Sequence, residues 1–519
     1  MNCAGTFSFV TEIETDVLVI GGGPAGAWAA VSAAAAGATV VLVDKAHCGS
    51  SGPTAHGAIA LWHIPPGPAR DEAVRRAHAH GGGLGDPDLM HRVLEEARQR
   101  VEHSARWGGR IAGDPAGPAR RRMHLDGARY LRRMRRVLRE AGVRVLDHHP
   151  ALQLLVDRDG VVAGAGGLRG DDGFRRWTVR AGAVVVATGG CAFLSGAAGT
   201  DVDTGDGLLF AVEAGAELSG MEFSCAYSLL PPGKAEPAAL RDSVLRFAPL
   251  YDESGAELPG HRSAALAAIA DGQRVFAALD DVPVAFRPPR RGPGRAERVP
   301  LRAVLEGTVR GTGGLRVTGP DCATTVAGLF AAGDVVSREA ITGAVSGSGG
   351  LSGAWAIASG AWAGTAAAKF ARTSDRRAPA REVPGAGLNA VARIDPRAVV
   401  GLVQEHTLPL RRSYWRSAGS LRDSIGELDG MWPGAEFDLG GSGVDLLRAR
   451  QAAALLAVAR WTKYSALLRT ESRGMHRRTD HPGASDTWRM RLMSGGVRSV
   501  WVRPDAPPSM PEQPRDIVA

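Results

Sequence analysis

Three glycines near the N-terminus have the spacing of a phosphate-binding turn. Gly21-Gly-Gly23-Pro-Ala-Gly26 follows the apolar run 16–20, for which we expect a buried parallel strand. The Ala-rich run 27–36 then predicts a helix, whose first N–H groups and dipole favour an anion. In this arrangement Gly21 permits a tight turn, Gly23 lets the backbone approach a pyrophosphate, and Gly26 allows close packing of helix on strand.

A second strand and an acid complete this pattern. Residues 38–43 predict a strand that ends at Asp44, and a carboxylate in that place suits the hydroxyls of a ribose. The alternative is a glycine-rich turn in an unrelated α/β protein, but the position of the acid would then be accidental. The sequence therefore predicts an α/β fold with a dinucleotide site.

Three later segments favour FAD as the dinucleotide. The polar, Gly-rich loop 45–55 is unlike the short continuation of a pure NAD domain. Residues 183–190 predict a buried strand that ends in a Thr-Gly-Gly turn, and residues 326–334 predict another that ends in Gly-Asp, which can hold a ribityl chain. Together these segments resemble the glutathione-reductase-type FAD flavoproteins.

Within that group the chain most resembles the succinate dehydrogenase/fumarate reductase flavoprotein family, which includes L-aspartate oxidase and the adenylylsulfate reductase flavoprotein. The loop 51–55 is similar to the family's S-G-A-T-A, and residues 205–207 are similar to its G-D-G helix start. Residues 468–482 resemble the long motif L-R-x-E-S-R-G-A-H-x-R-x-D-Y-P, for which we favour a domain-locking role. Two shorter segments, 123–131 and 338–355, lean toward the adenylylsulfate reductase branch.

The resemblance implies a set of cofactor-binding positions and a mode of binding. No histidine falls at the family's covalent-flavin position, near Gly52, so we expect non-covalent FAD. The positions implied are Gly21, Gly23, Gly26, Asp44, Lys45, Ser51, Gly52, Thr54, Ala55, Ala151, Ala187, Thr188, Gly189, Asp206, Gly333, Asp334, Gly350 and Leu351.

The fold class implied is α/β: a glutathione-reductase-type FAD-binding Rossmann-like domain with a reduced α+β capping domain and a C-terminal helical domain. A leader (1–14) precedes the first part of the FAD domain, and an Arg/Pro-rich linker (373–387) follows the second. The expected boundaries are 15–220 and 321–372 for the FAD-binding domain, 221–320 for the capping domain, 393–500 for the helical domain and 501–519 for a Pro-rich tail.

The substrate side departs from the family. Tyr227 stands where succinate dehydrogenase and fumarate reductase have the histidine of E-F-x-Q-F-H-P-T, while Thr342 and Ser346 stand where H-G-A-N-R-L-G has its histidine and its arginine. The family's R-G-E-G-x-x-L is not recognisable between Leu230 and Gly328. Because two carboxylates need cationic partners, we reject succinate, fumarate and aspartate as substrates.

We expect hydride transfer between a small-molecule substrate and the flavin, for example in a biosynthetic tailoring step. Four residues are catalytic candidates: Tyr227, His56, Arg338 and Thr342. Tyr227 and His56 could relay a proton, Arg338 could bind an anion, and Thr342 could donate a hydrogen bond. Each has a plain structural alternative: packing, a structural histidine, a salt bridge or a helix-start hydroxyl.

Two other functions stay open. One is the flavoprotein subunit of an electron-transfer complex with a ferredoxin-like iron–sulfur partner, as in adenylylsulfate reductase; the other is a flavin protein that has lost its catalytic residues. The five cysteines are scattered and include no C-x-x-C pair, so a partner would have to supply any cluster, and we expect no metal site. Intact flavin motifs beside altered substrate motifs favour changed specificity.

Composition adds several exclusions. Only four of the 62 Lys+Arg residues are lysines, which indicates coding bias. The basic run 120–136 is interpreted as a solvated face, since no aromatic ladder accompanies it for nucleic-acid binding. The N-terminus lacks a secretory signal, and the small-residue run 351–368 predicts a buried helix, not a membrane span. We expect a soluble, cytoplasmic protein; the sequence does not indicate an oligomeric state.

Overall fold

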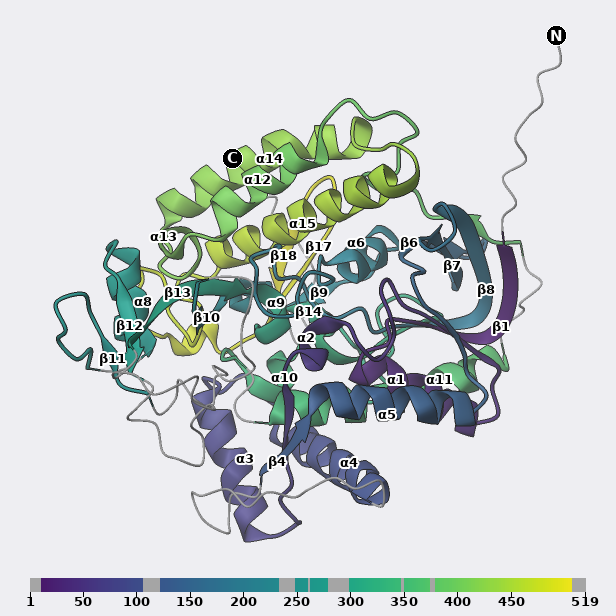
Figure 1. Ribbon diagram of the computed structural model, residues 1–519, viewed down its shortest axis with the longest axis horizontal. Helices are drawn as coiled ribbons and strands as arrows, with labels where there is room; N and C mark the ends of the chain where they lie inside the picture. The colour runs from purple at the N-terminus through teal and green to yellow at the C-terminus, as the bar shows by residue number, and fades with distance from the viewer. Residues whose placement is uncertain are drawn as a thin grey trace, which may run out of the picture.

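The computed structural model describes residues 11–105, 122–232, 248–259, 262–278, 298–346, 350–373 and 379–505. Its centre is a sheet in the order β16-β6-β7-β8-β1-β2-β5, with β15 paired to β8. The strands β1 (Thr11–Ile20), β2 (Val40–Val43), β8 (Arg175–Val186) and β15 (Leu329–Ala331) are parallel to one another. This arrangement confirms the α/β fold class, and the wide sheet lies among helices in Figure 1.

The register of these four strands decides where their loops meet. Ile20 pairs with both Val43 and Val186, and Val186 pairs with Ala331. Parallel strands whose last residues are aligned end at one edge of the sheet, so the segments that follow them are brought together there. The glycine turn, Asp44, the Thr-Gly-Gly turn and the Gly-Asp pair all follow at that edge.

Small residues let two helices pack closely against this edge. α1 (Pro24–Ala35) contacts α11 (Leu351–Ala371), where a Cβ on Gly364 would lie 2.0 Å from the Ala29 carbonyl oxygen. α11 is the buried helix expected from residues 351–368. Among the helices in the described ranges, none is long and apolar enough to cross a membrane.

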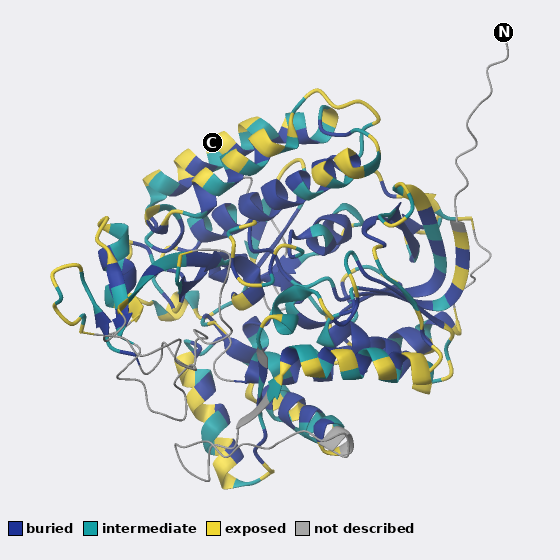
Figure 2. Cartoon of the chain, in the orientation of Figure 1, coloured by how far each residue is buried: buried dark blue, intermediate teal, exposed yellow. Residues whose placement is uncertain are grey.

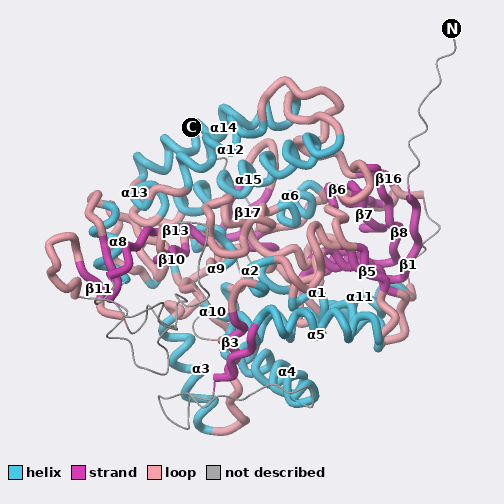
Figure 3. The backbone as a smooth tube through the Cα atoms, viewed as in Figure 1, coloured by secondary structure: helices cyan, strands magenta, loops and turns pink. Residues whose placement is uncertain are grey.

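A hairpin extends the central sheet on one side, and the capping region forms a separate smaller sheet. β6 (Ala151–Val156) and β7 (Val162–Arg169) make the antiparallel hairpin that the Asp159-Gly160 turn predicts. The capping region holds a sheet of β10 (Ala226–Leu230), β13 (Arg298–Glu306), β12 (Val275–Ala278) and β11 (Leu250–Tyr251). Figure 3 shows these capping strands well apart from the central sheet.

The C-terminal helices pack on the flavin domain. α15 (Gly443–Leu468), the long helix that the apolar spacing predicts, is sandwiched between α6 (Asp206–Glu213) and the outer helices α12 (Pro396–Thr407) and α14 (Ala418–Phe437). It is almost wholly buried, whereas α12 and α14 expose their outer faces (Figure 2). The helical region thus forms a second layer over the cofactor domain.

The remaining elements complete the chain. The expected leader and Pro-rich tail lie largely outside the described residues, as do 233–247 and 279–297 of the capping region. The other bounds are α2 (Gly52–Ala55), β3 (Ala58–Trp62), α3 (Pro68–His80), α4 (Pro87–Ala105), β4 (Arg122–Asp126), α5 (Gly127–Glu140), β5 (Arg144–Leu146), β9 (Leu218–Ser219), η1 (Met221–Phe223), α8 (Arg262–Ala270), α9 (Gly307–Arg310), β14 (Gly314–Leu315), η3 (Gly333–Val335), α10 (Glu339–Thr342), β16 (Arg381–Glu382), α13 (Leu410–Ser413), η4 (Asp486–Trp488), β17 (Leu492–Gly495) and β18 (Trp501–Pro504).

Candidate active site

The glycine turn is closed on one side and open on the other. Gly21 has φ +106°, and a Cβ there would lie 2.3 Å from the Ala187 carbonyl oxygen. A Cβ on Gly26 would lie 1.8 Å from the Gly21 carbonyl oxygen, whereas a Cβ on Gly23 would meet no atom within 4 Å. Gly23 is also the N-cap residue of α1, and it has no side chain that could accept a hydrogen bond from the first N–H groups of the helix. The turn therefore leaves open space at a helix N-terminus, which suits a phosphate.

Asp44 is fixed beside this turn. Its Oδ2 accepts a hydrogen bond from the Gly22 N–H at 2.7 Å, and its Oδ1 accepts one from the Ala46 N–H at 2.8 Å. The His149 N–H donates to the Asp44 carbonyl oxygen at 2.7 Å, which places the start of β6, including Ala151, near the same edge. The carboxylate is thus held where the second strand ends, as ribose binding requires.

A lysine and an aspartate join two distant segments of this edge. Lys45 Nζ donates to Asp206 Oδ2 at 2.5 Å and to Thr204 Oγ1 at 2.6 Å. Asp206 opens α6, and a Cβ on Gly207 would lie 2.0 Å from Thr188 Oγ1. The G-D-G helix start therefore packs directly on the Thr-Gly-Gly turn, next to Gly189.

The loop 51–55 is partly open to solvent. It forms the short helix α2, and Ser51 Oγ donates to the His47 carbonyl oxygen at 3.1 Å. The side chains of Ser51, Thr54 and Ala55 are neither buried nor fully exposed. A Cβ on Gly127 would lie 1.7 Å from the Thr54 carbonyl oxygen, so α5 begins in direct contact with this loop.

The Gly-Asp pair is anchored by α11. The Gly333 N–H donates to Ser359 Oγ at 3.0 Å, and Trp355 Nε1 donates to the Gly333 carbonyl oxygen at 3.1 Å. Leu351 is fully buried at the start of the same helix, and Gly350 caps it with φ +123°. The expected cofactor positions at 333–334 and 350–351 therefore belong to one packed unit.

Arg338 is internally satisfied. Its guanidinium donates to Asp334 Oδ1 and to the carbonyl oxygens of Thr308, Val309 and Gly311, and the residue is 2% exposed. These contacts occupy the fork that an anion would need. The structure thus shows Arg338 in a salt bridge with Asp334, and the anion contact expected from the sequence stays a prediction.

The other three catalytic candidates lie in separate surroundings. Tyr227 is buried on β10, where its hydroxyl donates to the Leu408 carbonyl oxygen at 2.9 Å and its ring packs edge-on against Tyr414. Thr342 is buried, and its hydroxyl donates to the Arg338 carbonyl oxygen one turn earlier, at 3.3 Å. His56 is exposed, with Nδ1 3.1 Å from the Gly52 carbonyl oxygen. Of the four, His56 is the candidate directly attached to the flavin-side loop.

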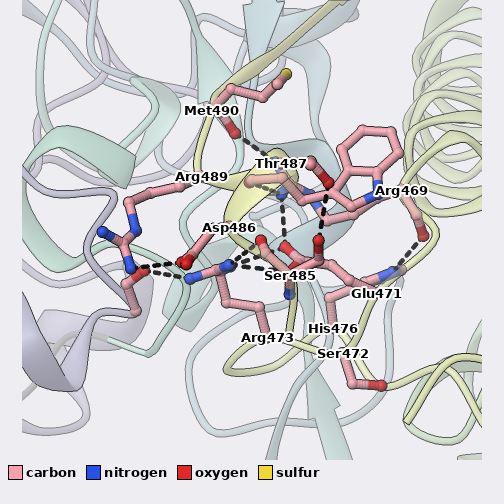
Figure 4. A network of polar contacts seen from close by, with 12 residues as sticks. Arg469, Glu471, Ser472, Arg473, His476, Ser485, Asp486, Thr487, Arg489 and Met490 are labelled. Atoms are coloured by element: carbon pink, nitrogen blue, oxygen red, sulfur yellow. Dashed lines mark hydrogen bonds and ion pairs between the residues drawn. The ribbon is translucent and has the colours of Figure 1, made fainter. Parts of the chain in front are cut away.

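The C-terminal motif forms a buried ion network that spans domains. Arg469 donates to Glu222 Oε1 at 2.8 Å and to Glu471 Oε1 at 2.9 Å, and Arg473 donates to both oxygens of Glu471. Arg473 also donates to the Gly82 carbonyl oxygen between α3 and α4. Figure 4 shows these side chains converging on Glu471. Such contacts agree with the domain-locking role expected of the motif.

One acid at the cofactor edge, Asp203, is not among the residues that the sequence patterns predict. It lies between the Thr-Gly-Gly turn and the G-D-G helix start, is 3% exposed, and adjoins Gly189. The signal that could have found it is an acid three positions before Asp206, in a segment expected to cross the cofactor edge.

These observations define an FAD-type dinucleotide-binding protein of the α/β class. The open face of Gly23, the fixed Asp44 carboxylate and the convergence of four strand ends all fit a bound dinucleotide. Two family models match the chain: "FAD binding domain" over residues 16–237 and "Fumarate reductase flavoprotein C-term" over residues 441–501. FAD is accordingly the cofactor.

Curated relatives point to the same group. The L-aspartate oxidase of Streptomyces coelicolor is 32% identical over 232 residues, covering 41% of this chain and 39% of that enzyme. A protein of the fumarate reductase (CoM/CoB) of Methanothermobacter marburgensis is 27% identical over 558 residues, covering 92% of this chain and 97% of that protein. The first match thus spans about two fifths of the relative's own length.

Solved structures share the fold. A mutant of the E. coli quinol fumarate reductase has a TM-score of 0.77 at 21% identity, covering 96% of this chain and 99% of that one. The adenylylsulfate reductase of Archaeoglobus fulgidus has a TM-score of 0.74 at 20% identity, covering 96% of both. The chain belongs to the succinate dehydrogenase/fumarate reductase flavoprotein family. The lean toward the adenylylsulfate reductase branch stays a prediction.

Proposed function

We propose that the protein is an FAD-dependent oxidoreductase that moves a hydride between a small-molecule substrate and non-covalently bound FAD, and that succinate, fumarate and L-aspartate are not its substrates. Bound FAD supplies the hydride acceptor or donor. The chain's own residues position the cofactor, exclude water and move the accompanying proton. The boundaries of the domains that do so are those proposed from the sequence.

The substrate proposal rests on two positions of the described residues, Arg338 and Ser346. Arg338 contacts Asp334 and three carbonyl oxygens through its two terminal guanidinium nitrogens, and Ser346 stands at the family's arginine position. Each carboxylate of a dicarboxylate needs a charged hydrogen bond worth about 1.5–3 kcal/mol. Relatives named L-aspartate oxidase make aspartate the first compound to test.

The test is anaerobic stopped-flow spectroscopy of the purified holoprotein. L-Aspartate and succinate should not bleach the oxidised flavin band, and fumarate should not reoxidise chemically reduced protein. A family member with the intact H-G-A-N-R-L-G segment serves as the positive control. Bleaching at a rate near that control would overturn the substrate exclusion while leaving the flavin assignment intact.

His56 is the proposed proton-transfer group. It is exposed at the end of α2, with Nδ1 on the Gly52 carbonyl oxygen, and Nε2 makes no hydrogen bond with the described residues. An imidazole with one anchored nitrogen and one available nitrogen can take a proton from a substrate as a hydride leaves. Tyr227 and Thr342 remain secondary candidates, since both hydroxyls donate to backbone carbonyls.

Non-covalent attachment has a direct test. Acid precipitation of the yellow protein should leave all flavin in the supernatant. Flavin that stays with the pellet would overturn non-covalent attachment, and His47 and His56, which flank the Gly52 position, would be the first residues to replace.

A second function is favoured by one surface: electron exchange with an acidic, ferredoxin-like iron–sulfur protein. α5 exposes arginines along one face, and only one residue of this helix, Glu140, is acidic. The same helix begins against the flavin-side loop at Thr54. The exposed arginines, continued past the helix end, are Arg129, Arg132, Arg136, Arg139 and Arg144.

Salt dependence and charge reversal test this surface. Electron transfer from the reduced holoprotein to an acidic ferredoxin should slow several-fold between 50 and 300 mM salt, because the shorter Debye length at the higher salt concentration screens the attraction between the two surfaces. The double variant R132E/R136E should slow it further at low salt, whereas R75E/R76E on α3 should not. Equal rates of electron transfer in both double variants would contradict a docking role for α5, and its arginines would then be a solvated face.

A further inference from the structure

Asp203 is a rigid, buried acid at the cofactor edge. It is 3% exposed, and its Oδ1 lies 2.4 Å from where a Cβ on Gly189 would be, at a glycine with φ +76°. Its N–H donates to the Thr200 carbonyl oxygen at 2.9 Å, and its own carbonyl oxygen accepts from the Ala192 N–H at 2.9 Å. The backbone of Asp203 is therefore held in place, and its side chain lies against the Thr-Gly-Gly turn.

The polar partners around Asp203 are already engaged elsewhere. Lys45, the cation nearest to it in the edge, gives its hydrogen bonds to Asp206 and Thr204. Asp203 Oδ2 has no hydrogen-bond partner among the described residues. Since an isolated buried carboxylate costs several kcal/mol, Asp203 needs either a proton or a partner.

The charges that face Asp203 favour the proton. Burial raises its pKa well above the usual range, Lys45 lowers it, and the carboxylates of Asp334, Asp206 and Asp44 raise it again. These three acids come from three different segments of the edge, so the field is a property of the assembled site. A protonated carboxyl has one O–H to donate, and that donor then needs an acceptor.

We propose that Asp203 is a cofactor-binding residue that, as a neutral carboxylic acid, donates a hydrogen bond to an oxygen of the pyrophosphate–ribityl part of bound FAD. Gly189 beside it, and the charged groups that act on it, Lys45, Asp44, Asp206 and Asp334, are expected cofactor positions, and the pyrophosphate brings two negative charges that an ionised acid would repel. The inference rests on FAD binding but adds a donor that the family motifs do not include.

The experiment measures FAD release from the holoprotein on dilution, by the rise of flavin fluorescence, between pH 6 and pH 9. Asp203→Val removes the donor and should weaken FAD binding about 10- to 100-fold at pH 7, the range of a hydrogen bond to a charged group. Asp203→Asn keeps a donor without ionising, so it should stay within about threefold of the wild type. Asp201→Asn, on the exposed side of the same segment, is the matched control.

The pH arm separates the neutral acid from a carboxylate. The wild type and Asp201→Asn should lose affinity toward high pH as Asp203 ionises, and Asp203→Asn should not. An Asp203→Asn protein as weak as Asp203→Val would show that the carboxylate is needed, and Asp203→Val with wild-type affinity would show no contact; either result overturns the proposal while flavin binding stands. If Asp203→Val does not fold, the proposal is decided by the FAD affinity of Asp203→Asn relative to the wild type and by how each affinity changes with pH.

Discussion

The cofactor edge and the C-terminal ion network are both polar and both buried, yet they are built in opposite ways. At the edge, Gly23 faces open space and Asp203 keeps an oxygen without a partner among the described residues. In the network, Arg469 and Arg473 direct their guanidinium groups onto Glu222, Glu471 and backbone oxygens. The cofactor edge leaves open space beside its polar groups, whereas the network engages its cations with carboxylates and carbonyl oxygens, although Glu222 Oε2 has no partner among the described residues.

This difference bears on the substrate side. Arg338 and Tyr227, chosen as catalytic candidates, resemble the network more than the cofactor edge, because their polar atoms contact backbone carbonyls and an internal carboxylate. His56, whose Nε2 makes no hydrogen bond with the described residues, resembles the edge.

The sharpest way to break the comparison is a pair of glycine variants. Gly23→Val should fold but contain no flavin, because φ at Gly23 is −69° and its Cβ enters only the ligand's space. Gly26→Val should damage the protein itself, because the added atoms meet the Gly21 carbonyl oxygen. Flavin-to-protein absorbance ratios and melting temperatures check both; full flavin in Gly23→Val would mean that the turn has been misread.

The next largest effect concerns stability. Arg469→Met leaves Glu222 and Glu471 buried without their shared cation, which should cost about 3–5 kcal/mol of unfolding free energy. Arg498→Met breaks the pair with Glu436 at a side chain that is 71% exposed, and should cost at most about 1 kcal/mol. Urea unfolding of both variants gives the two values; similar losses would contradict the claimed contrast between a lock and a surface pair.

A pH effect follows from Glu339, which faces this network. Burial, then the charge of Glu222, raise its pKa to about 7, against the opposing effects of Arg491, Arg469 and the Ser219 hydroxyl. A carboxyl with a raised pKa binds its proton more tightly in the folded protein. Its stabilising contribution is therefore present below about pH 4.5 and lost as the pH rises to about 7.

Glu339→Gln should remove that dependence. Relative to this variant, the wild type should lose on the order of 1 kcal/mol of stability per pH unit between pH 5 and pH 7. Glu382→Gln, at an exposed carboxyl on β16, should follow the wild-type curve. Melting temperatures across that range provide the measurement, and parallel curves for wild type and Glu339→Gln would count against a neutral Glu339.

The spacing of residues within single segments predicted several of the helices and strands. These elements in turn place most of the cofactor edge. The hairpin around Asp159-Gly160, the buried helix at 351 and the long helix to Leu468 each follow from spacing within the segment itself. The glycine turn was also readable, because its strand, helix and acid occur in order within residues 16–44. Parallel strand ends meet at one edge by geometry, so order along the chain was enough.

Contacts between distant segments were not readable. Nothing local in Arg338 indicates that the turn 308–311 would place three carbonyl oxygens around it. Likewise, the Leu408 carbonyl that accepts from Tyr227 lies 181 residues away. Family positions suggest where such residues lie, but the partners that consume their hydrogen bonds depend on how the capping and helical regions pack.

The smallest effect, and the most direct test of that lesson, is at Tyr227. Its hydroxyl donates to the Leu408 carbonyl oxygen, so Tyr227→Phe leaves that buried acceptor with one partner fewer and should cost about 1 kcal/mol. The edge-on contact with Tyr414 needs only the ring and should persist. Tyr251→Phe, a partly exposed tyrosine on β11 that packs on Arg298, is the control and should change stability by less. Flavin content and spectrum should be unaltered in both.

If Tyr227 instead supplied a proton to the substrate, flavin reduction would fall roughly 10²-fold with little change in melting temperature. We expect the stability loss without the rate loss, because a hydroxyl that ties a capping strand to the helical layer is committed to that contact.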